Sequence, residues 1–183
     1  MKHDELILRL AEGNRRYLAS SDAALRADTA LNGQRPHTIV IACSDSRVIP
    51  EQIFDAALGE LFVIRVAGNV LEDHQLGSVE YAAAHLGCEL VIVLGHTRCG
   101  AVAAALEGHA DGFIKSITDE IAAAIGEETD PLRACERNVL FSVERIRKEF
   151  AAHPEIERVR MVCFDERTKG FYDAAIAALG EEA

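Results

Sequence analysis

Three short apolar segments between residues 37 and 96 constrain the fold of this chain more than any other feature. They read HTIVIAC (residues 37–43), ELFVIRV (60–66) and ELVIVLGH (89–96). None of them alternates strictly between apolar and polar residues, which is typical of strands that are covered on both faces, as in parallel sheets. We therefore predict three strands of a mainly parallel sheet.

Helical patterns separate and follow these strands. Residues 75–87 lie between the second and third apolar segments and end in Gly87, a residue type that often terminates helices. Residues 99–108 follow the third segment and also read as a helix. This alternation of strands and helices predicts an α/β fold with a mainly parallel central sheet flanked by helices.

The N-terminal region has a helical pattern of its own. Apolar residues recur at helical spacing, which predicts a helical arm over residues 3–19, followed by a turn-prone connection over residues 20–37. The apolar stripe consists of Leu6, Leu10, Tyr17 and Leu18. Because this helix has little core near it in the sequence to cover, we expect a second copy of the chain to cover it.

The region after Gly108 is mainly helical. Isoleucines recur at helical spacing over residues 114–125, and Asp130 followed by Pro131 is typical of the start of a further helix. RVRMVCF (158–164) alternates, as a strand with one exposed face would.

The chain of 183 residues suits a single domain. We expect it to consist of an N-terminal arm and connection (1–36), a βαβ core with the site (37–109), and helices with a late strand (110–183).

Composition excludes some classes of function and favours one compartment. The chain has 30 acidic and 19 basic residues and a formal net charge of −11, which argues against nucleic acid or an anionic membrane as a partner. Its five cysteines are odd in number and include no C-x-x-C motif, which fits a reducing compartment. The N-terminus does not resemble a signal peptide and no apolar run approaches the length of a membrane span, so we expect a cytoplasmic protein.

The residues that carry chemistry follow two of the predicted strands. Cys43, Asp45 and Arg47 alternate directly after the first strand, and His96 with Cys99 ends the third. Ligands of open α/β sheets bind outside the carboxyl ends of the strands, where these residues should meet. Two Cys and one His are three zinc ligands, and a catalytic zinc keeps a fourth position open.

Each of these residues also has a simpler interpretation. A lone cysteine is usually a small buried hydrophobe, and we expect this of Cys88, Cys135 and Cys163. Asp45 alone could cap a turn, and Arg47 alone could form a surface ion pair. As a group, Asp45 could instead accept a hydrogen bond from metal-bound water while Arg47 holds the carboxylate in place.

Two motifs in combination, ACSDSRVIP (42–50) and LGHTRCGAV (94–102), strongly resemble the β-class carbonic anhydrases. GELFVIRVAGNV (59–70) and GSVEYAAAHLG (77–87) extend the resemblance over most of the chain. It implies a lyase, carbonate dehydratase, that reversibly hydrates carbon dioxide to bicarbonate and a proton through zinc-bound hydroxide. It also implies a homodimer or a dimer of dimers.

The resemblance also implies roles for individual residues. It places Zn²⁺ on Cys43, His96 and Cys99, and the orienting pair on Asp45 and Arg47. The residues that it implies around a small substrate pocket are Gln34, Ala67, Gly68, Tyr81 and Gly100.

The chain departs from the family pattern in two places. The family often has a Thr-Gly turn late in the chain, whereas this sequence reads VCFDERTKGFYD (162–173) with glycine at position 170. Some bacterial members close the zinc site with the orienting Asp under control of a bicarbonate site that contains Trp. This chain has no Trp, and Val40 stands at that place although Arg65 is present. We therefore expect an open site with an intact Asp45–Arg47 pair at neutral pH and above.

Two alternatives to this function remain. The same zinc site could hydrolyse carbonyl sulfide or carbon disulfide, which are linear and apolar like carbon dioxide. The chain could also be a non-catalytic scaffold that holds zinc, although the presence of both Asp45 and Arg47 argues against that interpretation.

Overall fold

The computed structural model of the chain describes residues 3–109 and 111–163, with side chains described as far as Met161. It falls into two units, residues 1–35 and residues 36–183. The expectation of a single domain stays a prediction. The departure from the family pattern around Gly170 lies outside the described residues.

The first unit contains two helices, α1 (His3–Leu18) and α2 (Ala23–Asn32). The predicted N-terminal helix is confirmed, but the prediction of an irregular connection over residues 20–37 is wrong for α2. Ala, Leu and Arg are strong helix formers, and the segment contains no Gly or Pro before Gly33. Neither helix has a buried residue.

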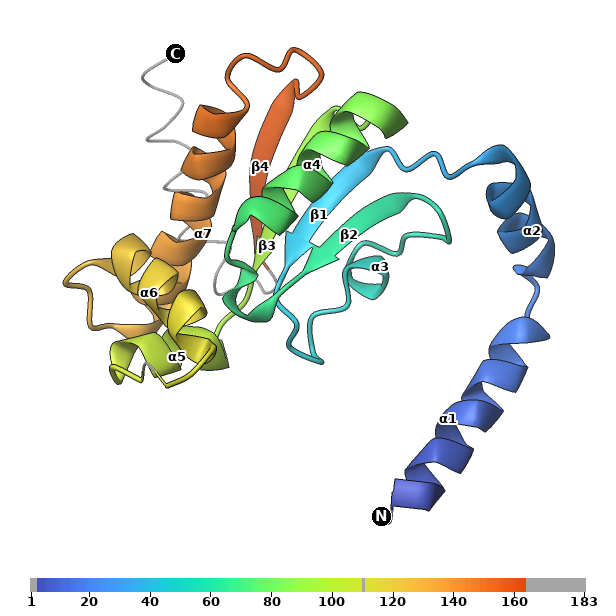
Figure 1. Cartoon of the computed structure of the whole chain (residues 1–183), viewed down its shortest axis with the longest axis horizontal. Coiled ribbons are helices and arrows are strands. Elements are labelled where there is room, and N and C mark those ends of the chain that lie inside the picture. Colours follow the sequence, from blue (N-terminus) through green and yellow to red (C-terminus); the bar gives the residue numbers. More distant parts are fainter. Residues whose placement is uncertain (1–2, 110, 164–183) are drawn as a thin grey trace. The chain divides into compact units, whose positions relative to one another are not determined.

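Four strands of the described residues form a parallel sheet at the centre of the second unit, in the order β2-β1-β3-β4 (Figure 1). The strands are β1 (Thr38–Ala42), β2 (Leu61–Arg65), β3 (Leu90–Gly95) and β4 (Arg158–Cys163). All five residues of β1 are buried, which confirms the prediction of a strand covered on both faces. The late strand is also confirmed, and it pairs in parallel with β3.

The helices of this unit connect the strands. They are α3 (Pro50–Ile53), α4 (Asp73–Leu86), α5 (Gly100–Leu106), α6 (Ile114–Ile125) and α7 (Pro131–Glu149), together with a single 3-10 turn, η1 (Ala67–Asn69). Two predicted helix ends are confirmed. Gly87 ends α4 in the left-handed conformation, and the Asp130 side chain accepts hydrogen bonds from the backbone N–H groups of Leu132 and Arg133 at the start of α7.

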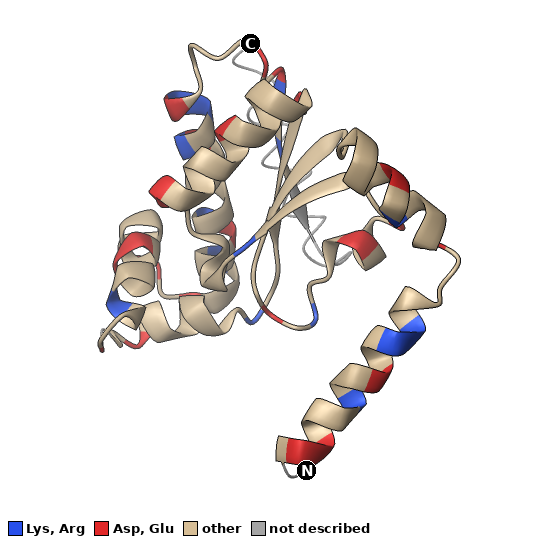
Figure 2. Ribbon diagram, turned by 45° about the vertical axis from the view of Figure 1, so that its right-hand side comes forward, with Lys and Arg blue, Asp and Glu red and all other residues tan. Residues whose placement is uncertain are grey.

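The two faces of the sheet have different cover. Ile39 and Ile41 of β1 pack with residues of α4 and α7 in the largest core cluster. Val40 and Ala42 face the other way and pack with Val48 and with residues of α3. The charged residues lie mainly on the helices and loops, while β1 and β3 carry none (Figure 2).

The strand order creates a switch point between β1 and β3. From β1 the chain passes to β2 on one side, and from β3 it passes to β4 on the other. Ala42 is level with Leu94, so both strands end at the same height. In open parallel sheets a switch point of this kind opens a crevice at the carboxyl ends of the strands. In the part of the chain that the structure describes, no helix is both long and apolar enough to cross a bilayer.

Candidate metal centre

Three buried side chains meet at the switch point between β1 and β3. Cys43 directly follows β1, His96 directly follows β3, and Cys99 is the N-cap of α5. The sulfur atoms of the two cysteines and a ring nitrogen of His96 all lie within 4.8 Å of one another. Each of the three residues is at most 5% exposed. This is the only such cluster of His, Cys, Asp and Glu among the described residues.

The geometry of the two thiols fits a tetrahedral metal ion. The distance from Cys43 Sγ to Cys99 Sγ is 3.9 Å, and both cysteines are free. Two thiolates each about 2.3 Å from a tetrahedral zinc ion would lie about 3.8 Å apart. The pair is therefore spaced for a shared metal ion.

The His96 ring has one satisfied and one unsatisfied nitrogen. Nδ1 lies 3.0 Å from the carbonyl oxygen of Thr97 and donates to it, which leaves the lone pair on Nε2. Arg47 Nη2 is also 3.4 Å from Nδ1, but a guanidinium cannot accept a hydrogen bond, so we assign the proton of Nδ1 to the shorter contact with Thr97. Nε2 is buried and has no hydrogen-bond partner. An orphaned, buried imidazole nitrogen beside two thiols is what a metal ligand requires.

Hydrogen bonds prepare Cys43 to be a thiolate. Donation by the Cys99 thiol and by the backbone N–H groups of Asp45 and Gly68 lowers the pKa of the Cys43 thiol. The pKa of the Cys99 thiol is raised, because it donates to Cys43 and because it is buried. Without a cation the two sulfurs share one proton, and a metal ion would allow both to ionise.

Asp45 and Arg47 form a bidentate ion pair beside the ligands. Arg47 Nε lies 3.0 Å from Asp45 Oδ1, and Arg47 Nη2 lies 2.9 Å from Oδ2. The backbone N–H of Arg47 also donates to Oδ1. These hydrogen bonds hold the pKa of the Asp45 carboxyl well below its usual range. Asp45 is therefore an ionised acceptor with a fixed orientation.

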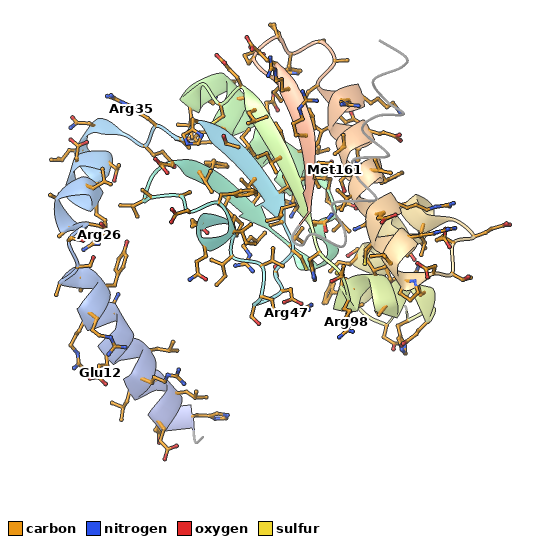
Figure 3. The ribbon with its side chains drawn as sticks, turned by 180° about the vertical axis from the view of Figure 1, so that it is seen from behind. Glu12, Arg26, Arg35, Arg47, Arg98 and Met161 are labelled. Atoms are coloured by element: carbon orange, nitrogen blue, oxygen red, sulfur yellow. The ribbon has the colours of Figure 1, made fainter. Side chains whose placement is uncertain are left out.

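Arg47 also ties the first motif to the second. Its Nη2 lies 3.3 Å from the carbonyl oxygen of Arg98 and 3.5 Å from that of Thr97. Arg47 and Arg98 lie at the same end of the sheet (Figure 3). Arg98 has a positive φ of 54°, so the backbone turns sharply between His96 and Cys99.

Arg65 fixes the backbone of the first motif, a role that the sequence did not suggest. It is the last residue of β2, and its Nε donates to the carbonyl oxygen of Cys43 at 3.0 Å. Its Nη2 donates to the carbonyl oxygen of Asp45 at 2.7 Å. The sequence does contain one indication of such a role, a charged residue at the end of an otherwise apolar strand.

The remaining residues implied by the family resemblance lie in different places. Gly68 is at the site, and its N–H lies 3.3 Å from Cys43 Sγ. Ala67 precedes it in η1, and Gly100 begins α5 directly after Cys99. Tyr81 lies on α4 with its ring against those of Phe62 and His85, and it is 49% exposed. Gln34 belongs to the first unit. Their roles around a substrate stay predictions.

Two further cysteines are buried, as expected of small hydrophobes. Cys88 donates from Sγ to the carbonyl oxygen of Pro36, and burial raises the pKa of its thiol. Cys135 of α7 is in the same apolar cluster as Cys43 and Cys99, and burial raises the pKa of its thiol too. The side chain of Cys163 lies outside the described part of the chain.

Fold and site together define a class: an α/β protein with a Cys–His–Cys group that could hold a metal ion at the switch point of a parallel sheet. The family model for carbonic anhydrase matches residues 38–162. The chain belongs to the carbonic anhydrase family, and its structural neighbours place it in the β class.

Relatives and solved structures agree with this assignment. Carbonic anhydrase 2 of Mycobacterium tuberculosis is 41% identical over 127 residues, which are 63% of this chain and 61% of that protein. The Coccomyxa β-carbonic anhydrase in complex with acetazolamide superposes with a TM-score of 0.68 at 27% identity, over 85% of this chain and 81% of that one. A tetrameric β-carbonic anhydrase of Sordaria macrospora has a TM-score of 0.68 at 24% identity, over 87% and 92%. The chain thus spans about three fifths of the length of the Mycobacterium relative that it matches.

Proposed function

We propose that the chain binds one zinc ion through Cys43, His96 and Cys99 and catalyses the reversible hydration of carbon dioxide to bicarbonate and a proton. The observation that carries the proposal is the buried, unpartnered Nε2 of His96, close to two thiols and next to an ionised, clamped Asp45. Family membership supports the choice of reaction.

The ligand set supports zinc in particular. Two thiolates and one neutral imidazole are common zinc ligands, and three protein ligands leave a position open for water. When bound, zinc would lower the pKa of that water towards neutrality and so supply a nucleophile.

The chain's own residues would orient the reaction. Asp45, held ionised by Arg47, accepts a hydrogen bond from the attacking water and so directs the oxygen lone pair to the carbon of carbon dioxide. One carbon–oxygen bond forms while the electron pair of a C=O π bond of carbon dioxide moves to oxygen, and one O–H bond of the water breaks. The products are bicarbonate and a proton, which leaves to buffer. His96 keeps its ring orientation through the hydrogen bond from Nδ1 to Thr97, as metal-binding histidines commonly do.

The site that we propose is open, with Asp45 paired to Arg47 rather than bound to the metal. Two side-chain hydrogen bonds and one backbone hydrogen bond hold Asp45, and a bidentate Arg–carboxylate pair is a strong charge-assisted contact. Closure would require Asp45 to leave this pair. An Asp45 oxygen within about 2.0–2.2 Å of zinc in a crystal structure at about pH 8 would overturn the open arrangement.

A homodimer or larger assembly is a further part of the proposal. Leu8, Leu10 and Leu18 of α1 are each at least 60% exposed, although α1 is amphipathic. A second copy of the chain could cover them, and the Sordaria macrospora structures of the same fold are described as tetrameric. Light scattering should report a mass of about 40 kDa or more, twice that of the 19.9 kDa chain. An active monomer would refute it. The cytoplasmic location stays a prediction.

The metal assignment is tested by elemental analysis of purified variants. We expect about one zinc per chain in the wild type and a loss of most zinc in Cys43→Ser and His96→Ala, because two ligands hold zinc far less tightly than three. Cys88→Ser is the matched control, a buried cysteine outside the cluster, and should keep its zinc. Full retention of zinc in either ligand variant would remove that residue from the site.

Stopped-flow kinetics on the zinc-loaded protein test the reaction. Rapid hydration of carbon dioxide supports the proposal. Hydrolysis of carbonyl sulfide without carbon dioxide hydration would favour the first alternative, and zinc binding without turnover of either substrate would favour the scaffold.

A further inference from the structure

One face of α7 carries three polar residues at helical spacing, Asn138, Ser142 and Arg145. Asn138 and Ser142 are only 2% and 3% exposed, on a helix face that is otherwise apolar. A buried amide or hydroxyl lowers stability unless it is hydrogen-bonded, so an apolar residue would pack at these positions at lower cost. The partners of the three side chains therefore indicate what they do.

Asn138 acts directly on one backbone segment, residues 68–71, and Arg145 acts on it through Glu120. Asn138 Nδ2 donates to the carbonyl oxygen of Gly68 at 2.7 Å. Ser142 Oγ lies 3.4 Å from the carbonyl oxygen of Asn69, but its single proton has a nearer acceptor in the carbonyl oxygen of Asn138, at 3.0 Å. Arg145 pairs with Glu120, whose Oε1 in turn accepts the N–H of Leu71 at 3.1 Å. We call Asn138, Arg145 and Glu120 the backbone clamp.

The clamped segment has an unfavourable conformation. Gly68 and Asn69 both have positive φ angles, 71° and 46°. A Cβ atom at Gly68 would lie 2.7 Å from Ile121 Cδ1 and 3.0 Å from Ala101 Cβ, so only glycine fits there. Glycine adopts the left-handed region without strain, but a non-glycine residue such as Asn69 persists there only where the surroundings hold it. The backbone clamp supplies that support.

The same segment contacts the candidate metal site. The N–H of Gly68 points at Cys43 Sγ from 3.3 Å and is one of two backbone donors to that sulfur. A hydrogen bond to a thiolate withdraws electron density from the sulfur, and such outer contacts tune both metal affinity and reactivity. The direction of this N–H depends on the conformation of Gly68.

We propose that Asn138 is a positioning residue for Cys43. By fixing the Gly68 carbonyl oxygen it holds the left-handed turn, and the turn aims the Gly68 N–H at the thiolate. The inference rests on the proposed function, because it assumes that Cys43 is a metal ligand. Asn138 itself touches neither metal nor substrate in this role.

The test uses the full chain loaded with cobalt(II), whose thiolate-to-metal absorption band in the near ultraviolet reports on the sulfur. Asn138→Leu removes the donor with little change in volume. Without the Gly68 N–H, the sulfur lone pairs rise in energy, so the band should move to longer wavelength. Zinc affinity, measured by competition with a chelator, should fall roughly tenfold, as is typical when an outer partner of a ligand is lost.

Val139→Ala is the matched structural control. Val139 is the next residue of α7 and is 1% exposed. It belongs to the largest core cluster, with Ile39 and Ile41 of β1. It should lower the melting temperature because it leaves a cavity. The absorption band and the zinc affinity should remain those of the wild type. If Val139→Ala shifted the absorption band as far as Asn138→Leu does, general loosening of α7 would explain the band shift in both variants. That result would overturn the proposal.

A second measurement needs no variant. In labelled wild-type protein loaded with cadmium-113, the Gly68 amide proton should show a scalar coupling to the metal through the N–H···S hydrogen bond. The Asn138 side-chain amide should show a coupling to the Gly68 carbonyl carbon. Absence of either coupling would overturn the proposal even if Asn138→Leu does not fold.

The outcomes separate this inference from the proposed function. If the wild type binds neither cobalt nor zinc, the proposed function is wrong, and this inference, which depends on it, is wrong as well. If the wild type binds cobalt and folded Asn138→Leu keeps the same band and affinity, only the role of Asn138 fails.

Discussion

Two Arg–carboxylate pairs lie around the candidate site, and they respond to their surroundings in opposite ways. Asp45–Arg47 lies in the loop after β1, where the two side chains are 22% and 49% exposed. Glu120–Arg145 joins α6 to α7, where they are 9% and 26% exposed. The pKa of Asp45 is lowered by its hydrogen bonds with Arg47. The pKa of Glu120 is raised, mainly because the carboxyl is buried.

The difference shows that contact with an arginine does not by itself determine the direction in which the pKa of a carboxyl group shifts. Asp45 keeps water on one side and receives three hydrogen bonds from Arg47, so its ionised form is strongly favoured. Glu120 loses more hydration, its Oε2 has no partner, and Glu72 lies close to it. The first pair suits a catalytic role that needs a permanent charge. The second suits a structural role in holding the backbone at Leu71.

The largest expected effect is on the buried pair. Arg145→Met should lower the free energy of unfolding by about 3 kcal/mol at pH 8, because it leaves Glu120 buried without its partner. Denaturant titration measures the loss. Lys148→Met, an exposed position on the same helix, should change stability by no more than about 0.5 kcal/mol. Equal stabilities of Arg145→Met and Lys148→Met would show that the ion pair with Arg145 does not stabilise the buried Glu120.

The exposed pair should matter for activity rather than for stability. Arg47→Ala should reduce carbon dioxide hydration roughly 10- to 100-fold while about one zinc per chain remains. The substitution removes the side chain that holds Asp45 in place, but it removes none of the metal ligands. Arg47→Lys keeps the charge but cannot form the bidentate pair, so its activity should be intermediate. Stopped-flow kinetics and metal analysis on the same samples provide the comparison. Loss of zinc in Arg47→Ala would contradict the separation of roles.

Glu120→Gln should change how stability depends on pH. A carboxyl whose pKa is raised in the folded state contributes stability that is complete below its unfolded pKa of about 4.3 and is lost as pH rises through the folded pKa. Glutamine does not titrate, so the stability of the variant relative to the wild type should increase as pH rises from 4 to 8. Unfolding titrations at several pH values test this. A constant difference would mean that the pKa of Glu120 is not raised.

The smallest effect concerns the titration of Asp45. Its pKa is lowered in the folded state, so its contribution to stability is complete above about pH 4 and is lost as pH falls through the lower folded pKa. The difference in melting temperature between wild type and Arg47→Ala should be constant from pH 8 to 5 and narrow below about pH 4. This difference in melting temperature should be small and should decrease further with added salt, because the ion pair is exposed. If the difference in melting temperature became larger below pH 4, the pKa of Asp45 could not be lowered in the folded state.

Much of the fold could be predicted from local patterns. The apolar segments at 37–43, 60–66 and 89–96 correspond to β1, β2 and β3 of one parallel sheet, because each run is long enough for a buried strand. Gly87 and Asp130 mark helix ends through interactions within a few residues, so the sequence alone was sufficient. The helix α2 was missed because little marks it out: the side chain of its N-cap residue Asp22 makes no capping hydrogen bond, and none of its residues is buried.

The sequence by itself determined which residues could bind a metal and that two parallel strands would present them at one end. Spacing after the strands was enough, since strand ends meet at one edge of a parallel sheet. Only the tertiary structure decided how the ligands are held. Arg65, Asn138 and Glu120 come from β2, α7 and α6, and their residue types alone do not show which backbone groups they will bind, those of Cys43, Gly68 and Leu71. Contacts between distant segments depend on how helices pack against the sheet, and a periodic pattern identifies the buried face of a helix but not the backbone group that each side chain will meet.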